Sequence, residues 1–185
     1  MPLTLVLLLR GINVSTSTSV PMPELRSLLA GAGYADAATL LRSGNVVLSA
    51  LEGQTPEAVA RDAERLIAER FGFDVAVVVR TAEELAAVAA QDPFDGAAHD
   101  GSRRVVAFLD GRPDADALAA VTAIDFGPER IVAAGRELHL WYPDGQARSP
   151  MAKELSRAKL GTVVTVRNWN TVQKLLKLTG GAESR

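Results

Sequence analysis

The chain has 185 residues, of which 48% are apolar and 23% charged, with a formal net charge of −2. These values are typical of one globular domain or two small subdomains, and they exclude wholesale disorder. The lack of cysteine excludes disulfides, a thiolate nucleophile and a thiolate metal site. Residues 3–9 are too short an apolar stretch to span a bilayer and lack the basic flank of a signal peptide. We therefore expect a cytoplasmic protein with no membrane partner.

The first 80 residues predict two helices among four strands. Pro21 and Glu24 open the first helix, because proline is tolerated in a first turn and an acid suits the positive end of the helix dipole. Thr55 is placed to cap the second helix, with Pro56 at its first position. The predicted order is strand 3–9, helix 21–32, strands 38–41 and 46–49, helix 55–71 and strand 75–79. This order is the ferredoxin-like βαββαβ unit.

The remainder predicts a second unit of the same kind. Thr81 and Glu84 match a capping box for a connecting helix, and a polar loop follows to residue 102. The next predicted elements are strand 104–109, helix 114–122, strands 130–133 and 137–142, helix 149–159, strand 162–166 and a last helix. In strand 137–142, His139 and Trp141 alternate with leucines, which predicts a half-exposed face.

The predicted fold class is therefore α+β, with two tandem ferredoxin-like βαββαβ subdomains and an added C-terminal helix. The first subdomain is expected at residues 1–80 and the second, with the last helix, at residues 103–180. Residues 81–102 are expected to form the connecting helix and loop.

Polar residues gather in two segments that this topology brings to one end of the first sheet. In a βαββαβ unit the strand order is 4-1-3-2, so the loop after strand one and the turn between strands two and three lie together. Arginine and free backbone N–H groups at a helix N-terminus stabilise an anion there. The predicted ligand-binding residues are Arg10, Asn13, Ser15, Arg42, Ser43 and Asn45. Ordinary turn geometry is the alternative explanation for the asparagines and glycines.

A second candidate site lies at the start of the last helix. Either Asn168 or Asn170 caps that helix and Trp169 packs into the core, or Arg167 and Trp169 stack a base or sugar whose polar edge the asparagines bind. We favour the packing interpretation for Trp169, because tryptophan is more often a core residue than a binding platform.

The C-terminal part of the chain is basic. Residues 145–179 carry seven basic side chains and one acid, a net charge of +6. Solvated helix faces account for such a charge, and an anionic partner such as nucleic acid is the alternative. The basic residues are Arg148, Lys153, Arg157, Lys159, Arg167, Lys174 and Lys177.

No motif in the chain assigns a reaction. His99, in the polar loop, and His139 are the only histidines, and they lack the spacing of a zinc site. The chain has no Walker A motif, no Rossmann glycine fingerprint and no Gly-x-Ser-x-Gly elbow. We therefore predict no cofactor and no metal. An enzyme built on this chain would act without a metal, with Arg10 or Arg42 as an electrophilic clamp.

Four stretches form longer motifs: residues 8–14 (LLRGINV), 20–25 (VPMPEL), 43–47 (SGNVV) and 165–172 (TVRNWNTV). With these motifs the chain resembles the bacterial domain-of-unknown-function 1697 family. The resemblance implies an α+β fold of two ferredoxin-like subdomains and no established activity. Family members often carry Gly-Gly and a lysine in the loop where this chain has Ser and Thr at 15–19. An anion in that loop would here be held by hydroxyls and by Arg10 or Arg42.

Overall fold

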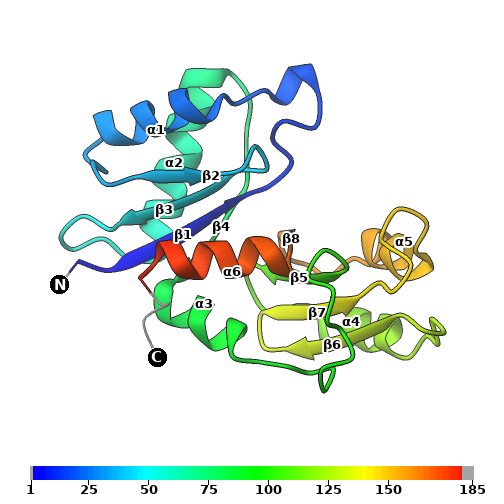
Figure 1. The fold of residues 1–185 in the computed structure, drawn as a ribbon. Coiled ribbons are helices and arrows are strands. Elements are labelled where there is room, and N and C mark those ends of the chain that lie inside the picture. Colours follow the sequence, from blue (N-terminus) through cyan, green and yellow to red (C-terminus); the bar gives the residue numbers. More distant parts are fainter. Residues whose placement is uncertain (1, 181–185) are drawn as a thin grey trace. The chain divides into compact units, whose positions relative to one another are not determined.

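The computed structural model of the chain describes residues 2–180 (Figure 1). These residues form two compact units, one containing the chain up to Ala89 together with the segment from Lys174, and the other spanning Ala90–Gln173. Each unit holds one four-stranded antiparallel sheet. No helix within residues 2–180 has the length and apolar character needed to cross a membrane.

The first unit has the βαββαβ order expected from the sequence. Its strands are β1 (Thr4–Leu9), β2 (Ala38–Leu40), β3 (Asn45–Ser49) and β4 (Val77–Thr81). Its helices are α1 (Met22–Gly31), α2 (Pro56–Phe71) and α3 (Ala82–Ala89), with a short 3-10 turn, η1 (Thr16–Thr18). The sheet order is β2-β3-β1-β4. Alternate leucines of β1 pack with Leu25 of α1 and Ile67 of α2 in one apolar core. This packing positions the loops that connect these strands and helices.

Local signals in the sequence explain where these helices begin. The Thr55 hydroxyl accepts a hydrogen bond from Ala58 N at 3.2 Å and so caps α2. The capping box before α3 is confirmed, because Thr81 N donates to the Glu84 carboxylate and Glu84 N donates to the Thr81 hydroxyl.

The second unit repeats the order of elements. Its strands are β5 (Arg104–Leu109), β6 (Arg130–Ala134), β7 (Glu137–Trp141) and β8 (Val164–Asn168). Its helices are α4 (Ala115–Thr122) and α5 (Pro150–Arg157), and the final helix α6 (Trp169–Leu178) follows β8. The sheet order β6-β7-β5-β8 matches that of the first unit. The predicted α+β fold of two tandem βαββαβ units plus a C-terminal helix is therefore confirmed.

One prediction for the second sheet is wrong, because the His139 and Trp141 face of β7 is buried. His139 is fully buried and Trp141 is 9% exposed. Phe94 and Ala98, from the loop before β5, pack against Trp141. That loop is polar on average, yet its few apolar residues face the sheet and exclude water from it.

Candidate functional site

The loop between β1 and α1 and the turn between β2 and β3 meet at one end of the first sheet (Figure 1). Two hydrogen bonds fasten them together. Leu9 N donates to the Gly44 carbonyl at 2.8 Å, and Asn13 Nδ2 donates to the Arg42 carbonyl at 2.7 Å. The topology expected from the sequence thus brings the two segments together.

Asn13 is the residue that organises this contact. Its Nδ2 also donates to the Val20 carbonyl at 3.0 Å, and its Oδ1 accepts from Val20 N at 2.9 Å. Both N–H bonds of the amide are therefore used within the protein. Asn13 adopts a φ of 56°, a left-handed conformation that asparagine tolerates better than most residues. Asn13 is accordingly a positioning residue for the loop.

Two arginines remain available at this end of the sheet. Arg10 and Arg42 are both exposed, and within residues 2–180 neither guanidinium has a hydrogen-bond or ion-pair partner. A guanidinium is a planar fork of N–H donors that matches a carboxylate or phosphate. The two segments thus present two unpaired cations on backbones that are tied to each other.

The other predicted site residues shape the loop and the turn. Ser15 Oγ lies 2.8 Å from Ser17 Oγ and 3.2 Å from Thr18 Oγ1. Asn45 is fully buried and donates from Nδ2 to the Leu40 carbonyl at 2.8 Å and to Ser43 Oγ at 3.2 Å. Ser43 is exposed, so its hydroxyl lies at the surface beside Arg42.

The start of α1 adds little to an anion site. Pro23 sits in the first turn and has no N–H to donate. Glu24 places a negative charge there and pairs with Arg70 at 3.0 Å. The attraction for an anion at this end of the sheet therefore comes from the two arginines.

In the second predicted site, Arg167 and Asn168 are used within the fold. Arg167 is 6% exposed and donates to Thr165 Oγ1 at 2.9 Å and to the Val166 carbonyl at 2.7 Å. Burial lowers the pKa of Arg167 to about 10. Asn168 Oδ1 accepts from both Thr171 N and Thr171 Oγ1 at 2.9 Å. Asn168 therefore caps α6, and exposed Asn170 does not have that role.

Trp169 stacks on an arginine that sequence reasoning did not single out. The Arg104 guanidinium carbon lies 3.6 Å from the centre of the Trp169 ring. Arg104 is 6% exposed, donates to the Gln91 carbonyl at 2.6 Å and lies near the Phe94 ring. Burial lowers the pKa of Arg104, and the nearby Asp92 carboxylate opposes that shift. The contact fits the packing interpretation of Trp169.

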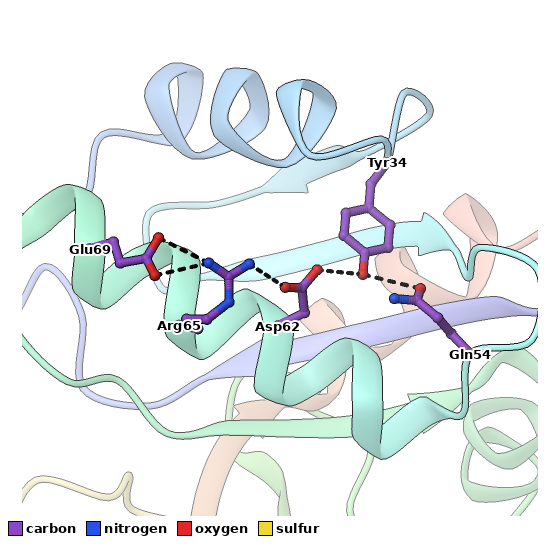
Figure 2. Close-up of polar contacts among 5 residues, drawn as sticks. All are labelled: Tyr34, Gln54, Asp62, Arg65 and Glu69. Carbon is purple, nitrogen blue, oxygen red and sulfur yellow. Dashed lines mark hydrogen bonds and ion pairs between the residues drawn. The ribbon is translucent and has the colours of Figure 1, made fainter.

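A polar chain on α2 was also missed from the sequence (Figure 2). The Tyr34 hydroxyl lies 2.9 Å from Asp62 Oδ2 and 3.1 Å from Gln54 Oε1. Asp62 pairs with Arg65 at 2.6 Å, and Arg65 pairs with Glu69 at 2.9 Å. Burial raises the pKa of Tyr34, and the Asp62 carboxylate adds to the effect. Arg65 thus pairs with two carboxylates, and the hydrogen bonds of Tyr34 link two loops to α2.

In the described part of the chain, no three histidine, aspartate or glutamate side chains gather into a group that could hold a metal ion.

Comparison with known proteins identifies the family. Residues 3–139 match the model of a family described as "Protein of unknown function (DUF1697)". The chain belongs to this family. The structure of the conserved bacterial protein SP0830 from Streptococcus pneumoniae has a similar fold, with a TM-score of 0.79 at 21% identity over 97% of this chain and 99% of that one. No protein with a curated description matches.

The DUF1697 match includes both segments of the arginine end, residues 10–19 and 42–45. It ends before β8 and α6, which carry the second predicted site. The family model therefore covers both Arg10 and Arg42 and the hydrogen bond from Asn13 that joins their segments.

We expect Asn13→Ala to lower the free energy of unfolding of this DUF1697 protein by about 2 kcal/mol. The substitution removes three hydrogen bonds and leaves a less tolerant residue at positive φ. Asn13→Gly restores the backbone freedom but not the hydrogen bonds, so its loss should be smaller. Urea denaturation of both variants measures the two contributions. Wild-type stability of Asn13→Ala would contradict the positioning role.

Proposed function

We propose that this protein binds a small anionic ligand, phosphorylated or carboxylated, at the end of the first sheet that carries Arg10 and Arg42, and that it does so in the cytoplasm. The supporting observation is that both guanidinium groups are exposed and without a partner in the described structure. They stand on two segments that the Asn13 amide joins at 2.7 Å.

Electrostatics favours an anion between these groups. Two arginines on neighbouring segments can both attract one bound anion. Charge-assisted hydrogen bonds from arginine to phosphate or carboxylate are about twice as strong as neutral ones. The fastened backbones also reduce the ordering that binding requires, which improves affinity.

We expect Arg10→Ala and Arg42→Ala each to weaken binding about tenfold or more, the loss of one charge-assisted interaction. A thermal-shift screen of nucleotides, sugar phosphates and carboxylates at two salt concentrations first finds a ligand, because a ligand stabilises the fold it binds. Calorimetry of the two variants then measures the loss. Arg61→Ala is the matched control, since it removes the same charge from an exposed arginine on α2.

The same screen separates this proposal from nucleic-acid binding. In the basic segment Arg167 is buried and Arg157 pairs with Glu154 at 3.3 Å, so fewer cations are available there than the sequence indicates. Oligonucleotide binding that falls steeply with salt and survives Arg10→Ala with Arg42→Ala would place the function in that segment. An undiminished small-ligand response in the double variant would likewise contradict the proposed site.

A further inference from the structure

The arginine end of the first sheet also exposes two apolar side chains. Val14 is 78% exposed and Leu41 is 46% exposed. Val14 follows Asn13 in the chain, and Leu41 precedes Arg42. Both are therefore one residue from the hydrogen bond that joins the two segments. Because neighbouring Cα atoms are only about 3.8 Å apart, the backbones of Val14 and Leu41 lie close to this hydrogen bond, on the same two segments that carry Arg10 and Arg42.

The backbone conformation of Leu41 is unfavourable for a leucine. Its φ is 59°, in the left-handed region where the Cβ of an L-residue is crowded. A bulky residue in this region is an outlier, and such outliers concentrate at binding and catalytic sites. Leu41 is 46% exposed and is not part of the buried core of the first unit. Neither the backbone nor the core accounts for a leucine here, whereas an apolar contact with a ligand does.

From this combination we propose that the ligand is amphipathic. Its phosphate or carboxylate group binds Arg10 and Arg42, and an attached aromatic or aliphatic group packs on Val14 and Leu41. The inference rests on the proposed function and adds the chemical class of the ligand. The flat face of a guanidinium also stacks on aromatic rings, so the arginines favour both parts of such a molecule.

The test compares phenyl phosphate with inorganic phosphate by calorimetry. We expect phenyl phosphate to bind about tenfold more tightly, since burying the ring adds a hydrophobic contribution. Leu41→Gly and Val14→Ser should remove most of that advantage and leave the affinity for inorganic phosphate unchanged. Leu41→Gly should fold with an unchanged or higher thermal midpoint, because glycine accepts positive φ. Ile124→Ser is the control, at a residue that is 43% exposed in the second unit.

Each outcome separates the two proposals. Equal affinity for the two probes, still dependent on Arg10 and Arg42, would overturn the amphipathic ligand and leave the anion site standing. An advantage for phenyl phosphate that survives both Val14→Ser and Leu41→Gly would also overturn it. Binding of neither probe in an arginine-dependent way would overturn both proposals. Val14→Ser keeps the test decisive if Leu41→Gly fails to fold, since the Val14 side chain lies almost entirely in solvent.

Discussion

Gly44→Ala is expected to lower the free energy of unfolding by about 3 kcal/mol. A Cβ at this position would lie 2.6 Å from Ile12 Cδ1 and 2.8 Å from Leu9 Cβ, and the residue has a φ of +82°. Leu9 and Ile12 are 1% and 3% exposed, so neither can move aside without disturbing the core. The left-handed conformation costs about 1–2 kcal/mol for an L-residue, and overpacking adds about 1–3 kcal/mol. Urea denaturation measures the change.

Gly53→Ala measures the cost of positive φ alone, without the steric clash expected in Gly44→Ala. Gly53 has a similar φ of +78°, but nothing lies within 4 Å of its Cβ position. We expect this variant to lose only about 1 kcal/mol. Equal losses in the two glycine variants would show that the turn does not press against Leu9 and Ile12. The larger loss at Gly44 would support a turn held tightly against the loop that carries Arg10.

The second large effect is expected in mild acid, where His139 should destabilise the fold. Burial lowers the pKa of His139 to about 4, and the Arg104 cation contributes to the shift. The unfolded chain has a histidine pKa of about 6.5, so it binds a proton more readily than the folded protein does. The stability is therefore complete above pH 6.5 and is lost as the pH falls from 6.5 to 4. Over this window we expect a loss of about 3 kcal/mol.

His139→Gln tests this origin directly. Glutamine does not titrate, and its amide can donate to Gln91 Oε1, which lies 2.8 Å from Nε2 of His139. Denaturation curves between pH 4 and pH 7 should be flatter for this variant than for the wild type. His99→Gln, at the exposed histidine, should keep the wild-type slope. An unchanged slope in His139→Gln would show that other groups cause the acid sensitivity.

Much of the fold could be predicted because its signals are local. Thr55 and Thr81 mark helix starts by hydrogen bonds to residues three positions later in the chain. The βαββαβ order alone then predicts that the Arg10 loop lies beside the Arg42 turn. Strand β4 begins at Val77, two residues later than expected, since the apolar residues before it carry no signal for a strand boundary.

The roles of individual polar side chains could not be predicted, because their partners are distant in sequence. Asn13 bonds to a carbonyl 29 positions away. Arg104 stacks on Trp169, which follows the neighbouring strand β8, and Gln91 reaches His139 from 48 positions away. The alternation of residues in β7 correctly predicts a strand. Nothing in that strand, however, indicates that Phe94 and Ala98 cover the face that carries His139 and Trp141.

The most direct test of the anion site is an NMR titration with phenyl phosphate that follows the arginine Nε–H resonances. We predict saturable shifts of the Arg10 and Arg42 resonances with one common dissociation constant, while the Arg61 resonance stays in place. Unmoved Arg10 and Arg42 resonances, with shifts confined to the basic residues of the C-terminal segment, would contradict the proposed anion site.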